Sequence, residues 1–153
     1  MTTSLYLSSI TNAIAAISIT GVTVKDVDEI SSSWIGTPNI LYPNPNAPGF
    51  VTNFEITFDS VLQGANAPMT LRYTLNYRFL GTAIGDMGTF TVAYANVITK
   101  IIAIYNALIA VPKPYDGRIT MTPRIVDIGS KEDPAGNQFH GADFSLSIEE
   151  LQN

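Results

Sequence analysis

Two stretches near the middle of the chain alternate apolar and polar residues, and they constrain the fold more than any other feature of the sequence. In Asn53–Leu62 the alternating apolar residues are Phe54, Ile56 and Phe58. In Met69–Leu80 they are Met69, Leu71, Tyr73, Leu75, Tyr77 and Phe79. Successive side chains of a strand point to opposite faces, so each stretch predicts a strand with one buried face and one polar face. The short connection at 63–68 predicts that the two strands form an antiparallel hairpin.

The segment Thr89–Val111 is long and strongly apolar, and Lys100 is its only charged residue. At 100° per residue, small and polar residues fall on one arc of a helix. The opposite arc carries Tyr94, Val97, Ile98, Ile101, Ile102, Ile104, Tyr105, Leu108 and Ile109. A helix surrounded by lipid has no reason to keep a polar side. The pattern therefore predicts a helix that lies on a sheet, and it argues against a membrane span.

Weaker patterns complete the predicted fold. They are a helix at about Ser4–Ser18, a short strand at Val22–Val27, strands at Arg118–Ile128 and Ala142–Ile148, and a polar loop at Ser130–Asn137. Pro123 predicts that its strand lies at a sheet edge or contains a bulge. The order of elements favours one α+β domain over residues 1–153, with a mostly antiparallel sheet and two helices packed on one face.

A proline-rich stretch at 31–50 separates the first short strand from the hairpin. Pro43, Pro45 and Pro48 lie within six residues, and we expect them to exclude a central strand or helix there. The stretch is therefore predicted to be a long ordered loop or an arm. Its aromatic residues Trp34, Tyr42 and Phe50 are candidates for contact with a partner, because exposed aromatic residues are enriched at protein interfaces.

The charge of the chain is low and net acidic. Lys and Arg number 8 against 13 Asp and Glu, and charged residues make up only 14% of the sequence. The cations are scattered along the chain, which disfavours a phosphate-binding groove for nucleic acid. Neutral polar and small residues replace the missing charges, and they lose water at lower cost than ions do. This composition favours extensive contacts between subunits.

No pattern predicts catalytic, cofactor-binding or metal-binding residues. His140 is the only histidine, and in a strand it would face away from Asp143. The glycines at 81, 85 and 88 lack the spacing of a phosphate-binding loop. The acidic groups at 26–29, 132–133 and 149–150 are expected to be solvated. Since the chain also has no cysteine, we expect a protein that is not an enzyme and needs no cofactor or metal.

The order and size of the predicted elements resemble those of the tail terminator proteins of long-tailed bacteriophages. The likeness covers nearly the whole chain and includes a closing strand that is reached through a stretch at 137–144 containing Gly141 and two Phe residues. It implies a structural virion protein that forms a homohexameric ring, caps the tail tube and joins tail to head. The implied partners are the tail tube protein and the head–tail connector. DNA would pass through the ring without sequence-specific binding, and the protein would be assembled in the host cytoplasm.

On this interpretation we expect certain residues at the subunit interface. They are Trp34, Ile35, Tyr42, Phe50, Arg72, Arg78 and Phe139. Two alternatives remain open from the sequence. One is a tail tube or head–tail connector subunit. The other is a small-molecule binding module with a cavity between the sheet and the apolar helix, lined by Tyr73, Tyr77 and Tyr105.

Overall fold

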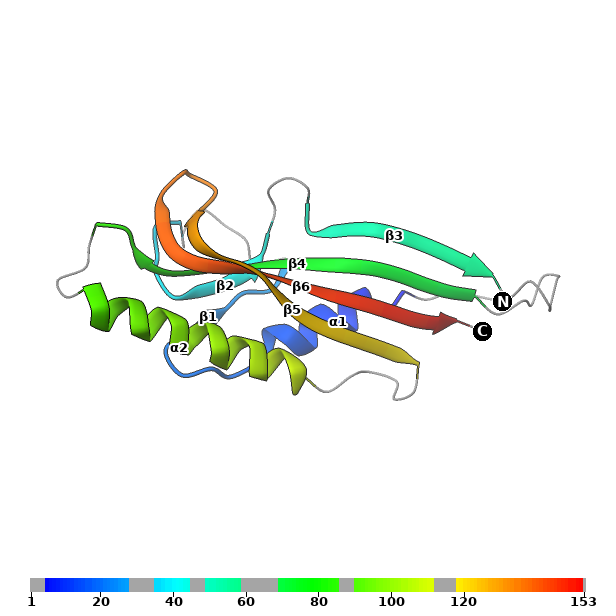
Figure 1. Cartoon of the computed structure of the whole chain (residues 1–153). Coiled ribbons are helices and arrows are strands. Elements are labelled where there is room, and N and C mark those ends of the chain that lie inside the picture. The colour runs from blue at the N-terminus through cyan, green and yellow to red at the C-terminus, as the bar shows by residue number, and fades with distance from the viewer. Residues whose placement is uncertain are drawn as a thin grey trace.

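A computed structural model of the chain describes residues 5–27, 35–44, 49–58, 69–85, 90–111 and 118–152. Two helices and six strands occur in these ranges, which confirms the α+β fold class (Figure 1). Their order is α1 (Leu7–Ala15), β1 (Thr23–Val24), β2 (Ile40–Pro43), β3 (Val51–Phe58), β4 (Met69–Ala83), α2 (Phe90–Ile109), β5 (Ile119–Glu132) and β6 (Gln138–Gln152). The predicted hairpin is present, since β3 pairs antiparallel with β4.

Strand β4 is the centre of the sheet. The strand order is β1-β2-β4-β6-β5, and β3 also pairs with β4. Because β6 runs along one whole side of β4, β2 and β3 share the other side and lie end to end. All the pairings are antiparallel except that of β1 with β2, which is parallel.

Both helices pack on the same face of the sheet, as predicted (Figure 1). Helix α1 contributes Ile10 and Ile14 to the core, and α2 contributes a stripe at helical spacing, Val97, Ile101, Ile104 and Leu108. They meet the alternating apolar residues of β4 and β6, namely Tyr73, Leu75, Tyr77, Phe79, Ala142, Phe144, Leu146 and Ile148. By length and composition alone α2 could span a membrane, but here one of its sides is packed against strands.

The expectation for the proline-rich stretch is wrong at residues 40–43. These residues form β2, which is fully buried between β1 and β4. Three apolar residues precede Pro43, which is the last residue of the strand. Its missing N–H therefore leaves the pairing of the residues before it intact. The next residue, Asn44, donates its backbone N–H to the carbonyl of Asn76 on β4.

The last two strands are longer than predicted. Strand β5 continues to Glu132 and β6 begins at Gln138, so the first three residues of the predicted polar loop at Ser130–Asn137 belong to β5 and the remaining five form the connection. Cross-strand pairs continue to Glu132 and Gln138, which lie opposite each other at the end of the hairpin. The turn curls away from the helices (Figure 1). Helix α1 is shorter at both ends than the predicted helix.

Candidate functional site

The sheet has one outer edge along β3 and another along β5. Within the described residues, β3 pairs only with β4, and β5 pairs only with β6. An edge strand presents unpaired N–H and C=O groups that can bind another strand. These two edges lie on opposite sides of the sheet, so each is free to meet a different neighbour.

The apolar side chains of β3 are exposed, contrary to the prediction that they face the core. Phe54, Ile56 and Phe58 are 46%, 55% and 61% exposed, and we call them the β3 ridge. They do face the helix side of the sheet, because Ile56 pairs with buried Leu71 and the ring of Phe54 stacks on Tyr73 at 5.3 Å. Strand β3 extends past the helices in Figure 1, which explains why its apolar face remains uncovered.

The β5 edge is partly protected against association. Pro123 lies in this edge strand, as predicted, and the register shifts between Ile125 and Asp127. The backbone carbonyl of Arg118 accepts a hydrogen bond from the N–H of Leu151 on β6, so residue 118 directs its backbone groups toward β6. Backbone groups alternate in direction along a strand, and Pro123, five residues further on, therefore directs its own outward. Beyond the shift, Ile128 pairs with buried Ala142 and is exposed on the helix side.

The side of α2 nearest β5 is also apolar. Ile98, Ile102, Tyr105 and Ile109 form a stripe at helical spacing, which we call the α2 flank. Ile102 and Ile109 are 53% and 48% exposed. Two contacts show which way the flank points. Tyr94, which is in line with the flank, contacts His140 on β6. Lys100, on the other side of the helix, binds Asn39 beside β2, so the flank points away from β2 and toward β5.

The helix-free face of the sheet is polar, and its middle rows carry mainly uncharged side chains. Cross-strand pairing aligns Thr52 with Thr74, Thr74 with Ser147, and Ser147 with Thr122 across four strands. The flanking row places Asn76, Ser145 and Arg124 side by side. Two open hollows of about 590 and 430 Å³ lie along these rows. Hydroxyl and amide groups therefore dominate this surface.

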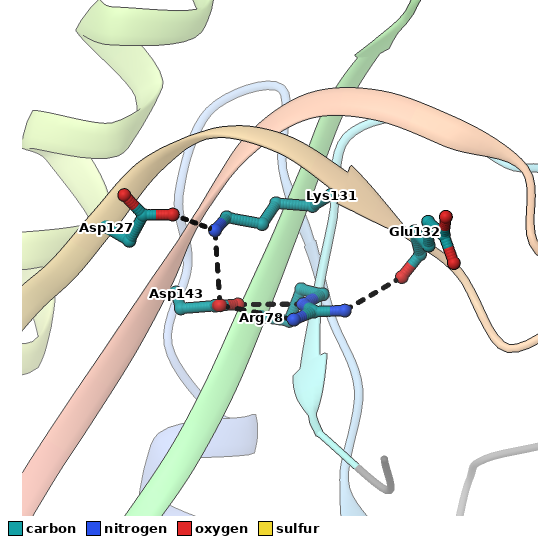
Figure 2. Close-up of polar contacts among 5 residues, drawn as sticks. All are labelled: Arg78, Asp127, Lys131, Glu132 and Asp143. Carbon is teal, nitrogen blue, oxygen red and sulfur yellow. Dashed lines mark hydrogen bonds and ion pairs between the residues drawn. The ribbon is translucent and has the colours of Figure 1, made fainter. Parts of the chain in front are cut away.

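A charge cluster lies where β4, β5 and β6 run together (Figure 2). Arg78 donates from Nε and Nη2 to the two carboxylate oxygens of Asp143, at 2.7 and 3.1 Å, and from Nη1 to the carbonyl of Glu132. Lys131 bridges Asp143 and Asp127. Two cations thus face two carboxylates. The hydrogen bond to Asp143 raises the pKa of Arg78, and that with Lys131 lowers the pKa of Asp127.

Two acidic residues that were expected to be solvated are buried instead. Asp133 accepts the backbone N–H groups of Gly36, Ala135 and Asn137 and the side-chain amide of Asn137. Glu150 is 0% exposed, and it accepts from the Tyr73 hydroxyl, the Tyr6 backbone N–H and the Gln152 amide. Hydrogen bonds compensate both carboxylates, which therefore serve to connect distant segments.

His140 lies in an aromatic environment rather than among carboxylates. Its ring meets Phe90 and Tyr94 of α2 edge-on, at 6.2 and 5.7 Å between centroids. Asp143 lies on the other sheet face, as predicted. Among the described residues no group of three or more His, Asp or Glu side chains could hold a metal ion.

The residues that were predicted to lie at a subunit interface have different surroundings. Tyr42 and Phe139 are 0% and 1% exposed in a small core cluster with Ile40 and Leu80, so neither is available at the surface. Burial raises the pKa of Tyr42 to about 12. Phe50 is half-buried with its ring edge-on to Tyr77, and Ile35 is half-buried. Trp34 lies outside the described residues.

The two predicted interface arginines are on the helix-free face. Arg72 is exposed and donates to Glu149 at 2.9 Å, while Arg78 belongs to the charge cluster. The sequence therefore pointed to the helix-free face through its arginines. It missed the β3 ridge as an exposed surface, because the alternation of β3 is the same as that of a strand with one buried face. Tyr73 and Tyr77, assigned to the cavity of a binding module, are buried in the core between sheet and helices.

A scan against models of known protein families gives no match, and a search of curated proteins finds no similar sequence. The residues and the geometry of the chain itself therefore carry the functional interpretation.

Proposed function

We propose that this chain is a structural subunit that assembles with copies of itself into a closed ring, and that the ring is the tail terminator of a long-tailed bacteriophage. The ring would cap the finished tail tube and provide the surface that joins tail to head. Six copies are what the resemblance to tail terminators implies. The role requires no catalytic residue.

The observation that carries the proposal is the relation between the two sheet edges. Since β3 is antiparallel to β4, β4 to β6 and β6 to β5, the outer strands β3 and β5 run in opposite directions. If a second copy is placed beside the first by rotation about an axis along the strands, its β3 meets β5 of the first copy in antiparallel orientation. Such a contact uses a different surface on each copy. Repeating it gives a closed ring when the rotations between successive copies add up to one full turn.

The helix-free face supports a channel lining. In a ring closed through the sheet edges, one face of the sheet would line the central channel. The face without helices carries no second layer, so it would take up less of the channel than the helix side. Its hydroxyl and amide rows, with the Arg72–Glu149 and Arg78–Asp143 pairs, present little net positive charge. A lining of this kind would let a polyanion such as DNA pass without gripping it.

The proposal is tested by the size and shape of the particle. Light scattering and negative-stain electron microscopy of the purified chain, alone and mixed with tail tubes, should reveal closed rings or tubes with capped ends. A uniform monomer that also leaves tube ends uncapped would exclude the proposal. Filaments of stacked rings would instead favour a tail tube subunit, which polymerises along its axis.

A further inference from the structure

We infer that β3 of the unassembled chain pairs with β3 of a second copy about a two-fold axis at Ile56, which gives a dimer with a closed β3 edge. The occupant of the β3 ridge is thus the same ridge of another copy. The inference rests on the proposed function and deepens it, because β3 is also the edge that would meet β5 in the ring. The dimer therefore regulates assembly, since its two copies must separate before a ring can close.

The backbone at Ile56 points away from the sheet. Asn76 on β4 donates its backbone N–H to the carbonyl of Phe50, just before β3, so residue 76 directs its backbone groups toward the β3 side. Backbone groups alternate in direction along a strand, and Arg72, an even number of residues before Asn76, therefore points the same way. Arg72 pairs with Glu55 of β3. The next residue, Ile56, thus offers its N–H and C=O to a strand outside the sheet.

A two-fold axis at Ile56 places every ridge residue opposite another ridge residue. Ile56 then faces Ile56 of the second copy, and Phe54 faces Phe58 in both directions. An axis at Glu55 would bring two carboxylates face to face, and like charges directly opposite each other are destabilising. An axis at Thr57 would leave Phe54 without a ridge partner. With the axis at Ile56, Glu55 lies opposite Thr57, so the register joins apolar to apolar residues and faces no carboxylate with another.

The two ridges also share one face of the combined sheet. A two-fold axis perpendicular to the sheet preserves the faces, and each ridge points to the helix side, as the stacking of Phe54 on Tyr73 establishes. On that side β3 extends past the helices and leaves its apolar side chains exposed (Figure 1). The two copies extend from the axis in opposite directions along the strands. Each ridge therefore meets its counterpart at the same level, beyond the helices of both copies.

The size of the contact indicates a dimer that can be separated. The three ridge side chains are between 46% and 61% exposed. Half of an aromatic side chain is roughly 100 Å², so the ridge would bury about 300 Å² per copy. Stable interfaces bury about 800 Å² per partner, and one pair of strand edges adds only a part of the difference. The dimer thus covers an exposed apolar edge in the unassembled chain but leaves that edge recoverable for assembly.

The first test uses single thiols, because the chain contains no cysteine. Ile56→Cys places two thiols beside the axis, so a short bismaleimide should join unassembled chains into covalent dimers. The matched control is Val51→Cys, which is exposed on the same strand. Across the axis, residue 51 would lie roughly 30 Å from its counterpart, so this variant should give no dimer. In a β3–β5 contact the two variants would behave alike, because rotation about an axis along the strands separates both pairs of thiols similarly.

The second test uses charge and needs no cross-linker. Ile56→Lys and Ile56→Glu should each weaken dimerisation at least about tenfold, because each variant brings like charges together on the axis. An equimolar mixture of the two should form a mixed dimer, measured by sedimentation equilibrium. Recovery in the mixture would also show that both variants are folded. A mixture that stays monomeric would contradict the axis at Ile56.

The third test addresses regulation. The cross-linked Ile56→Cys dimer should fail to cap tail tubes, because a locked dimer cannot open its β3 edge. The same variant without cross-linker should cap them. Capping by the locked dimer would overturn the regulatory role.

The outcomes separate this inference from the proposed function. If the wild-type chain caps tubes but is monomeric before assembly, or if Ile56→Cys and Val51→Cys cross-link equally, the inference is overturned and the ring remains. If tube ends stay uncapped while Ile56→Cys alone gives a dimer, the proposed function is overturned and the β3–β3 contact is supported. Dimers specific to Ile56→Cys, together with recovery in the charge mixture, support the contact.

Discussion

Glu150 illustrates how a single side chain can connect the two ends of a chain. It lies on the last strand, yet its carboxylate accepts a hydrogen bond from the backbone of Tyr6, just before α1, at 2.9 Å. The Tyr73 hydroxyl donates to the other oxygen. A buried carboxylate costs free energy unless such donors compensate for the lost water. The three donors therefore fix where α1 begins relative to the sheet.

Replacing Tyr73 by Phe should destabilise the protein. The change removes one donor from a buried carboxylate, and the expected cost is about 1–3 kcal/mol. For a chain of this size that corresponds to a decrease in Tm of roughly 2–12 °C, measurable by calorimetry. The control is Tyr105→Phe, whose hydroxyl makes no hydrogen bond within the described part of the chain. Equal effects of the two changes would contradict the role assigned to Glu150.

Asp133 should make stability depend on pH. Burial by itself would raise the pKa of its carboxyl, but the hydrogen bonds from Asn137, Gly36 and Ala135 outweigh burial and lower it. A folded-state pKa below the unfolded value of 3.8 means that the contribution to stability is complete above that value. It is lost as the pH falls through the folded-state pKa.

Asp133→Asn should therefore cost stability at neutral pH and less in acid. The amide can accept at one oxygen only, so donors on the other side lose their partner, at a cost of about 1.5–3 kcal/mol. Urea unfolding at pH 7 and at about pH 3 gives the free energy of unfolding of the variant and of the wild type. The difference between these two free energies should be smaller at the lower pH. Glu55→Gln on exposed β3 serves as the control. A difference independent of pH would refute this account.

At the scale of elements, β4 and β6 approach closely where Gly81 and Gly141 lie. A methyl group added at Gly141 would lie 1.9 Å from the carbonyl oxygen of Phe79, and one added at Gly81 would lie 2.6 Å from that of His140. The register of this pair also shifts between Leu80 and Ala83. Only residues without a side chain allow the strands to cross here and β6 to curl toward its turn.

Gly141→Ala should be severely destabilising. The added methyl group meets backbone that cannot move without breaking the pairing of two strands, so the expected cost is about 3 kcal/mol or more. Gly129 lies directly opposite on β5, and a methyl group there meets nothing within 4 Å. Gly129→Ala should therefore change stability by less than about 1 kcal/mol. Chemical unfolding of both variants compares them directly, and similar costs would disprove the steric explanation.

The sequence predicted the elements whose pattern is long and periodic. The stripe of α2 and the alternation of β4 each extend over many residues, and both were correct in type. The buried face of β4 was also correct, whereas the apolar arc predicted for α2 is too wide, because Ile102 and Ile109 of that arc are exposed. The alternation of β3 predicted a strand correctly but not its exposure, because period two reports which residues share a face and not what covers that face. Strand β2 was missed because its four residues are too few to set a period and end in Pro43.

The candidate site was only partly predictable for a related reason. Burial of Asp133 and Glu150 depends on donors from Gly36 and Tyr6, about a hundred residues or more away in sequence. No local pattern reports such partners. The low charge of the whole chain, by contrast, is visible in the sequence, and the expectation of contacts between subunits came from it. The position of the β5 edge was also anticipated, from Pro123.

At the scale of the whole molecule, association should be almost insensitive to salt. The large exposed apolar side chains of β3 and α2 are the surfaces that self-assembly would bury, and screening acts on charges. Sedimentation between about 0.05 M and about 0.5 M sodium chloride should therefore give closely similar dissociation constants. A steep weakening with salt would indicate that the charged residues of the helix-free face make the contact instead. Arg72→Gln provides the control for that alternative.

The hydrogen bond between Tyr6 and Glu150 also determines the layout of any assembly. It holds the first described residues beside the last strand, at the end of the sheet that lies beyond α2 (Figure 1). In a ring with rotational symmetry, every copy would then direct Tyr6 and Glu150 toward the same rim. A fluorescent probe attached at Leu5 or at Leu151, which are both exposed, would therefore decorate that rim alone and leave the opposite rim unlabelled.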